Sequence, residues 1–330
     1  MEKTRFILVV GLSLSLIFSW TNSYEVKASA KSIGEPSFVP RDLHFAAAGD
    51  WSCNGITNRT VNNIQNKNPD LVLALGDFSY QKGTGCWFNI MSPLINKTKI
   101  VIGEHDFDAN NVITNDTRLM DYVNRFNLTN PYYSFNYGNV HFLAMSSIIP
   151  FSNQTVQYRF LRDESNQHDF ISNDLYTASQ NKSIQWIVVY LYKPMYTSPT
   201  LHPAQNSLRD VYHSLFDYYG VDLVLQAHNH NYQRSYPLRF NQTNSSTPTI
   251  TDRNNSVYIN PNGTIFMIVG TAGANQYKLL GKSPDTVTQF QRYGFVNFDT
   301  ADNGTKLIGT FYDSLDGNAK DNFTIIKRRS

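Results

Sequence analysis

Short, almost continuous apolar runs recur over the first 225 residues, and they limit the possible folds more than any other feature of the sequence. Such runs are typical of strands that are buried on both faces of a sheet. They lie at residues 43–48, 71–75, 99–102, 184–191 and 221–225. Residues 58–66 and 205–219, which fall between these runs, favour helices, the second with an apolar stripe along one face. Alternating strands and helices predict a layered α/β core.

The last third of the chain has a different pattern. Further strands are predicted at residues 264–269, 293–298, 306–312 and 322–326, with Asp302-Asn303-Gly304 as a turn signal between two of them. We expect these strands to form a second, antiparallel sheet. Residues 239–262 are rich in Asn, Ser, Thr and Pro, which predicts a long surface loop.

Composition and charge exclude some classes of function. The chain has 28 Lys and Arg against 26 Asp and Glu, without a basic stripe, so the electrostatic footprint of a nucleic-acid-binding protein is missing. Two cysteines, Cys53 and Cys86, are too few for a disulfide framework, and they form no Cys-x-x-Cys motif. In an oxidising compartment they can pair or stay unpaired, and the sequence leaves both alternatives open.

Residues 1–30 have the three regions of a secretory signal peptide. Lys3 and Arg5 precede an apolar stretch at residues 6–18, and Ala28-Ser29-Ala30 offers a cleavage site. The apolar stretch is shorter than the roughly 20 residues that span a bilayer, so we favour a removed signal over a retained anchor. Residues 31–42 then form a linker, and residues 43–330 form one domain. We expect a protein that is secreted or on the extracytoplasmic cell surface, without a membrane span after signal removal.

Asparagine-linked glycosylation motifs favour the same compartment. The sequence holds twelve Asn-x-Ser/Thr triplets, all beyond the predicted signal. This is about twice the number that chance would give, so we expect a glycoprotein. The triplets begin at Asn58, Asn96, Asn115, Asn127, Asn153, Asn181, Asn241, Asn244, Asn254, Asn262, Asn303 and Asn322.

Four of the apolar runs end at polar clusters that hold metal-ligand side chains. The clusters are Gly49-Asp50, Gly76-Asp77-Phe78-Ser79-Tyr80, Gly103-Glu104-His105-Asp106 and His228-Asn229-His230. Open α/β sheets bind ligands at the carboxyl ends of their strands. One Asp in such a place is usually a turn or capping residue, but four clusters in the same context predict a metal site.

The order of these clusters is similar to that of the calcineurin-like metallophosphoesterases. Tyr80, three residues after the second Asp, points to the purple acid phosphatase branch. Further matches are Trp186-Ile187-Val188-Val189, Lys193-Pro194-Met195-Tyr196-Thr197-Ser198, Asn231-Tyr232-Gln233-Arg234 and Val269-Gly270-Thr271-Ala272-Gly273. The resemblance runs from about residue 43 to the C-terminus. It implies an α/β fold, a four-layer α/β/β/α sandwich of two mixed sheets flanked by helices.

The resemblance also implies a dinuclear metal centre. By position, Asp50, Asp77, Tyr80 and His230 would bind a ferric iron, and Asp77 would bridge to a second, divalent ion of Fe, Mn or Zn. Two carboxylates and a phenolate suit a hard trivalent ion. The alternative is that Tyr80 is an ordinary core-facing aromatic residue and Asp50 a helix cap.

The second metal site departs from the family pattern. Glu104 stands where the family has Asn, and Tyr192 stands where it has His, while Asp77 and His228 remain. Glu104 is a competent oxygen ligand for a divalent ion. An un-ionised Tyr192 is a poor one, because the pKa of a phenol is about 10. We therefore expect a second site that is either rebuilt on oxygen or weakened.

Two histidines match the catalytic histidines of the family. His105 lies within the third cluster, and His202 follows the Lys193 segment. Either could protonate the leaving alkoxide while a metal-bridged hydroxide attacks phosphorus, since histidine titrates near neutral pH. The alternative for His202 is a solvated loop histidine. We treat His44, His141, His168 and His213 as structural.

The leading interpretation is a secreted, metal-dependent phosphatase, a hydrolase of phosphomonoesters and, as a second class, diesters. The alternative is a metal-binding surface protein that kept the fold but has weak or no activity, because Glu104 and Tyr192 alter half of the site. Hydrolysis by a nucleophilic serine has little support, since no Gly-x-Ser-x-Gly motif occurs.

Overall fold

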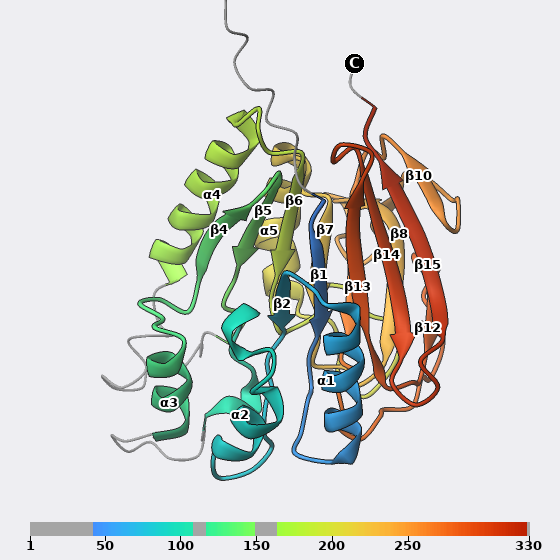
Figure 1. The fold of residues 1–330 in the computed structure, drawn as a ribbon. Helices are drawn as coiled ribbons and strands as arrows, with labels where there is room; N and C mark the ends of the chain where they lie inside the picture. The colour runs from blue at the N-terminus through green and yellow to red at the C-terminus, as the bar shows by residue number, and fades with distance from the viewer. Residues whose placement is uncertain (1–41, 108–116, 149–163, 329–330) are drawn as a thin grey trace, which may run out of the picture. The chain divides into compact units, whose positions relative to one another are not determined.

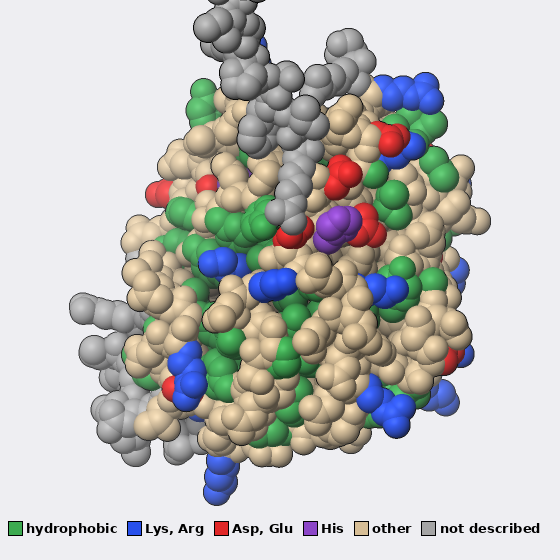
Figure 2. Space-filling view, in the orientation of Figure 1, with side chains coloured by type: hydrophobic (Ala, Val, Ile, Leu, Met, Phe, Trp, Pro, Cys, Tyr) green, Lys and Arg blue, Asp and Glu red, His purple; other side chains and the backbone are tan. Residues whose placement is uncertain are grey.

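The computed structural model describes residues 42–107, 117–148 and 164–328 (Figure 1). The predicted signal peptide and all but the last residue of the predicted linker lie outside these ranges, as do the glycosylation motifs that begin at Asn115 and Asn153. Figure 2 shows one face of the molecule, on which Lys and Arg side chains lie in separate small groups.

The strands of the described residues form two mixed sheets. The first has seven strands, in the order β10 (Val257–Ile259), β15 (Ala319–Ile326), β14 (Lys306–Asp313), β13 (Gly294–Ala301), β1 (His44–Ala48), β2 (Leu71–Ala74) and β3 (Thr98–Ile100). The second has eight, in the order β12 (Thr286–Phe290), β8 (Tyr232–Arg239), β11 (Thr264–Val269), β7 (Leu223–Gln226), β6 (Trp186–Tyr190), β5 (Val140–Ala144) and β4 (Tyr133–Tyr137), with β9 (Thr249–Ile250) beside β8. The fold class that the resemblance implies is therefore confirmed.

The expectation of a separate antiparallel C-terminal sheet is wrong. Strand β11 lies parallel to β7 inside the second sheet, whereas β13 pairs antiparallel with β1 and carries β14 and β15 into the first. The first five residues of β13 are all buried, so this strand belongs in the interior of a sheet. The predicted surface loop also contains two short strands, β9 and β10.

Helices cover the outer faces of the two sheets (Figure 1). Helices α4 (Glu164–Gln180) and α5 (Asn206–Tyr219) lie along the second sheet and share one apolar cluster with it. Helix α1 (Gly55–Lys67) lies on the first sheet, with α2 (Gly85–Met91) near it. The remaining helical segments are α3 (Thr117–Arg125) and the short η1 (Ile95–Lys97) and η2 (Glu104–Asp106). No helix in the described ranges is long and apolar enough to cross a membrane.

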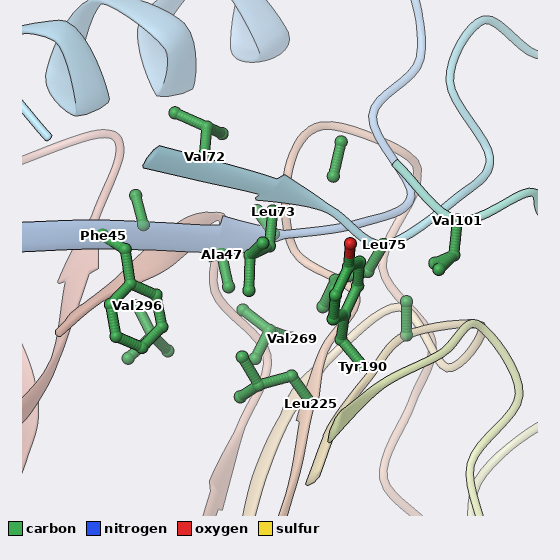
Figure 3. Packing of buried hydrophobic residues seen from close by; sticks show 14 of the residues in the cluster. Phe45, Ala47, Val72, Leu73, Leu75, Val101, Tyr190, Leu225, Val269 and Val296 are labelled. Atoms are coloured by element: carbon green, nitrogen blue, oxygen red, sulfur yellow. The ribbon is translucent and has the colours of Figure 1, made fainter. Parts of the chain in front are cut away.

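The main core lies between the two sheets (Figure 3). Phe45 of β1 stacks on Phe298 of its own sheet at 4.7 Å and meets Phe142 of the other sheet edge to face at 5.2 Å. Leu225 and Val269 of the second sheet lie opposite Ala47 of the first, and Tyr190 lies beside Leu75 (Figure 3). This packing fixes the two sheets against each other, so that the loops at their strand ends can build one site.

Candidate metal centre

The loops that follow β1, β2, β3 and β7 meet at one edge of the sandwich. The backbone N–H of Asp50 donates to the carbonyl of Gly76 at 3.0 Å, which ties the first loop to the second. The N–H of Gly49 donates to Val269 of the other sheet at 2.9 Å. The carboxyl ends of strands from both sheets thus carry the predicted ligands, as the sequence indicated.

Four of these ligands have a left-handed backbone. The φ angles are 57° at Asp50, 53° at Asp77, 54° at Tyr80 and 68° at His228. Residues other than glycine rarely adopt this conformation, and each case costs about 1 kcal/mol or more. Their concentration at one place indicates that the surrounding structure holds the side chains in orientations that function requires.

Two glycines allow other groups to approach the carboxylates closely. A Cβ atom at Gly103 would lie 2.2 Å from Oδ1 of Asp77, and one at Gly270 would lie 2.4 Å from Oδ2 of Asp50. No side chain fits at these distances. Both glycines are therefore needed for the carboxylates to keep their positions.

Asp50, Asp77, Tyr80 and His230 converge on one point. The Tyr80 hydroxyl lies 3.1 Å from Oδ1 of Asp50, 3.0 Å from Oδ2 of Asp77 and 2.9 Å from Nε2 of His230. Ligand atoms of Asp50, Asp77 and His230 all lie within 4.8 Å of one another, and all three side chains are buried. The structure thus brings together the whole set that the sequence predicted for the first ion.

The orientation of His230 is set by its other ring nitrogen. Its Nδ1 lies 2.7 Å from the carbonyl oxygen of Asn275, so Nδ1 carries the proton and donates it there. The other nitrogen, Nε2, then faces the cluster, where burial lowers the pKa of His230 but the Asp50 carboxylate 3.5 Å away raises it, with a net rise. Tyr277 stacks on the His230 ring at 3.9 Å and holds the ring plane.

The carboxylates of this cluster have few hydrogen-bond donors. The Tyr80 hydroxyl has one proton for oxygens of both Asp50 and Asp77, and Oδ2 of Asp50 has no hydrogen-bond partner among the described residues. Buried carboxylates are normally paired or bound to a metal. The donor set of two carboxylates, an imidazole and a phenol fits a metal ion, and the unmatched acceptors are where such an ion would bind.

Burial and the crowding of negative groups also raise pKa values in the cluster. Burial, followed by the charges of Asp50 and Asp106, raises the pKa of Asp77 well above its ordinary value. Burial and the two neighbouring carboxylates also raise the pKa of Tyr80. A bound cation would favour the ionised forms of both groups, because it supplies the missing positive charge.

The groups predicted for the second ion are arranged differently. The buried Tyr192 hydroxyl lies 2.5 Å from Oδ2 of Asp77 and 2.9 Å from Nδ1 of His228. Burial and the charge of Asp77 raise the pKa of Tyr192, so it remains a neutral phenol. Glu104 forms an ion pair with Lys193, and its other oxygen lies 3.6 Å from Nδ1 of His228. Burial lowers the pKa of His228 to about 2.

The two predicted catalytic histidines lie on either side of the cluster. His105 donates its backbone N–H to Oδ1 of Asp77 at 2.8 Å, and its ring lies 4.4 Å from that of Tyr80. His202 stacks on His228 at 4.1 Å. The side chain of Asn229 binds both the N–H and the carbonyl of His202, so the His-x-His segment holds the loop of His202 in place. His202 lies in a partly exposed loop next to the site, and its catalytic role stays a prediction.

A cavity of about 380 Å³ opens beside the cluster. Its lining residues are Ser52, Tyr80, His105, His230, Ala274, Asn275 and Tyr277, and none of them is a lysine or an arginine. Sequence reasoning missed Asn275 and Tyr277, which belong to no metal-ligand motif. The Gly270-Thr271-Ala272-Gly273 match, just before them, was the available signal.

Cys53 and Cys86 form a disulfide, with Cα atoms 6.0 Å apart. The sequence left their pairing open. The bond ties the loop that carries Asp50 to the start of α2. It therefore links the segment after the first ligand to the segment after Tyr80.

Comparisons with known proteins agree with this site. A family model described as calcineurin-like phosphoesterase matches residues 42–232. Purple acid phosphatase 22 of Arabidopsis thaliana is 26% identical over 276 residues, which cover 79% of this chain and 57% of that protein. The chain spans about half the length of the curated relatives that it matches.

Two solved structures share the fold. Purple acid phosphatase PPD1 from yellow lupin (Lupinus luteus) seeds has a TM-score of 0.69 at 19% identity, over 87% of this chain and 54% of that one. GAP50, described as the anchor in the inner membrane complex of Plasmodium, has a TM-score of 0.63 at 16% identity, over 88% of this chain and 90% of that one. Together with the family model, these findings show that the chain belongs to the calcineurin-like phosphoesterase family, in its purple acid phosphatase-like branch.

Proposed function

We propose that this protein is a metal-dependent phosphoesterase that hydrolyses phosphomonoesters, with phosphodiesters as a second substrate class. The observation that carries the proposal is the convergence of Asp50, Asp77, Tyr80 and His230 around unmatched acceptor atoms. Because the chain belongs to the phosphoesterase family, we interpret this cluster as a metal site for phosphoester hydrolysis. The altered positions Glu104 and Tyr192 are part of the proposal, because they set this site apart from the family pattern.

A cation is required for a phosphate ester to approach this site. The cluster holds two carboxylates, and no lysine or arginine lines the cavity beside it, so a metal ion would supply the positive charge that an anionic substrate needs. A metal ion on the first site would also polarise a phosphoryl oxygen and lower the pKa of a water molecule. Because Tyr80 is a phenol ligand, we propose ferric iron as the first ion, and the family pattern implies a divalent second one.

Side chains of the protein itself would protonate the leaving group. His105 lines the cavity, and His202 stacks on His228 at 4.1 Å. Desolvation lowers the pKa of both histidines, which makes each a stronger acid when it is protonated. Either can hold the proton that the leaving alkoxide takes up. Tyr277 stacks on His230 at 3.9 Å and meets the His202 ring at 5.3 Å.

Hydrolysis of an aryl phosphate by the purified chain tests the proposal. We expect turnover that depends on added metal and that Asp50→Asn and His230→Ala each abolish. The matched controls are Asp299→Asn and His44→Gln, which change an exposed Asp–His pair remote from the cluster and should leave turnover unchanged. A chain that binds metal tightly but shows no hydrolysis under any metal condition would refute the proposal.

A second candidate is a metal-binding surface protein with weak or no turnover. The arrangement of Tyr192, which contacts both Asp77 and His228, favours it, because these are two of the ligands expected for the second ion. GAP50, which shares the fold, is described as an anchor. One metal per chain without hydrolysis is the result that this candidate predicts.

We propose an extracytoplasmic location as well. Nine of the ten glycosylation asparagines in the described residues are exposed, and Asn241 is partly buried. The exposed ones are Asn58, Asn96, Asn127, Asn181, Asn244, Asn254, Asn262, Asn303 and Asn322. Intact-mass analysis of protein from its native source should give a mature chain that begins near Lys31 and carries glycans. A retained Met1 would contradict the proposed signal peptide.

A further inference from the structure

The half-site around Tyr192 has a closed hydrogen-bond pattern. The Tyr192 hydroxyl lies 2.5 Å from Oδ2 of Asp77, a distance at which it donates its proton to the carboxylate. Its oxygen then accepts from the Nδ1–H of His228 at 2.9 Å. A hydroxyl has one proton to give and lone pairs to accept with, so both contacts are satisfied at once. This contrasts with the first cluster, where Oδ2 of Asp50 has no partner among the described residues.

Packing holds the Tyr192 side chain in place. The Tyr192 side chain is buried, and its ring meets the His228 ring at 5.0 Å in a T-shaped arrangement. On another side it packs against Gly76, where a Cβ atom would come within 2.8 Å of Cδ2 of Tyr192. The hydroxyl therefore cannot leave its place between Asp77 and His228 unless the ring is unpacked.

Glu104, the remaining candidate ligand, already has a positively charged partner. One oxygen of Glu104 contacts the ammonium group of Lys193, and the other lies 3.6 Å from Nδ1 of His228. Lys193 directly follows Tyr192 in the chain, so the phenol and the ammonium group enter the half-site together. A divalent ion at this place would face a lysine at short range and would have to displace the proton that His228 donates.

We infer that the chain binds a single metal ion, on Asp50, Asp77, Tyr80 and His230, and that Tyr192 with the Lys193–Glu104 pair takes the place of the second ion. This inference concerns the same site as the proposed function and rests on it for the first ion. It departs from the dinuclear centre that the family implies. The second half-site is then a network of hydrogen bonds and one ion pair that orients Asp77 and His228.

Metal stoichiometry tests the inference directly. Chelator-treated full chain is titrated with Zn²⁺ in a calorimeter, and bound zinc is counted by elemental analysis after desalting. We expect one tight equivalent for the unchanged protein and two for the double variant Tyr192→His with Glu104→Asn. Tyr190→Phe is the matched control, because Tyr190 is buried two residues away and bonds to Tyr133 instead of the site. It should bind one equivalent.

A second variant covers the case in which the double variant does not fold. Lys193→Gln removes a partly exposed ammonium group without opening the core. We expect it to keep the tight equivalent and to bind a second, weak zinc ion at least about threefold more tightly than the unchanged protein, because the repulsion is gone. An unchanged weak affinity would count against the inference.

The outcomes separate this inference from the proposed function. Two tight equivalents in the unchanged protein would overturn the inference, even if the protein hydrolyses an aryl phosphate. One tight equivalent without hydrolysis would support the inference and remove the proposed function. No tight zinc would overturn the inference, and the hydrolysis assay would then decide the proposed function separately. A folded double variant that still binds one equivalent would show that Tyr192 and Glu104 do not exclude the second ion, and would also overturn it.

Discussion

Oδ2 of Asp106 accepts the backbone N–H of Asp77 at 2.8 Å. The same oxygen accepts the N–H of Gly103 at 2.7 Å, and Oδ1 accepts that of Phe78 at 2.7 Å. One buried carboxylate thus ties the loop after β2 to the loop after β3. Burial raises the pKa of Asp106 to about 7, and the three donors pull it back toward its ordinary value. Asp106 is what holds Asp77 in its left-handed conformation.

We predict that Asp106→Asn weakens both the fold and the metal site. An amide cannot accept with both of its terminal atoms, so at least one of the three N–H groups loses its partner. The expected cost is about 1–3 kcal/mol in unfolding free energy and about 10- to 100-fold in affinity for the first metal ion. Urea unfolding and Zn²⁺ titration measure the two effects. The exposed Asp316→Asn is the control and should change neither quantity.

Much of the fold could be predicted from the pattern of apolar residues, because the central strands are buried on both faces. The strand at residues 264–269 was predicted with its observed bounds, and the helix at 205–219 within one residue. Helix α1 begins earlier than predicted because the side chain of Asn54 caps it by accepting from Ile56 and Thr57. The Asp302-Asn303-Gly304 turn is present between β13 and β14, with positive φ at all three residues.

Strand β8 was missed for a physical reason. Its sequence is polar and contains a proline, although most of the strand is buried. Arg234, the third residue of the strand, can be buried because Asp321 of the other sheet accepts from it at 2.6 and 2.9 Å. A search for apolar runs does not detect a strand whose burial depends on an ion pair with a distant residue.

The first metal cluster was predictable because each ligand follows a strand within a motif. Lys193 and Tyr277 were not predicted as parts of the site. Lys193 belongs to the site because it pairs with Glu104, and Tyr277 belongs to it because its ring stacks on His230. Both contacts join segments far apart in the sequence, and neither residue type is specific for a metal site.

Removal of the disulfide should destabilise the protein. Cys53 and Cys86 close a loop with a sequence separation of 33 residues. Loss of such a cross-link costs about 2–4 kcal/mol, because the unfolded chain gains conformational freedom. We predict this loss for the double variant Cys53→Ser with Cys86→Ser, measured by urea unfolding. If the variant and the oxidised protein unfold at the same urea concentration, the bond does not constrain the chain in solution.

Tyr80→Phe should remove any colour from an iron-loaded protein. A ferric ion bound to a phenolate absorbs visible light by ligand-to-metal charge transfer, and the Tyr80 hydroxyl is the phenol at the centre of the first cluster. Tyr277→Phe is the matched control, since Tyr277 stacks on His230 and should keep the absorption band. Visible spectra are compared at equal iron content. A band that survives Tyr80→Phe would place the chromophore on another residue.

The last prediction concerns acid stability. His213 is fully buried, its Nδ1 accepts from the Tyr196 hydroxyl at 2.7 Å, and burial lowers its pKa from 6.5 to about 3. Between these values the unfolded chain binds a proton that the folded chain does not, so stability is lost as the pH falls from 6.5 toward 3.

His213→Asn keeps an acceptor for Tyr196 but does not titrate. From pH 6.5 to 4.5, its unfolding free energy should therefore fall less than that of the unchanged protein, by about 2 kcal/mol. Urea unfolding with a chelator present measures both slopes without a contribution from metal release. Equal slopes for His213→Asn and the unchanged protein would mean that His213 takes up its proton without unfolding.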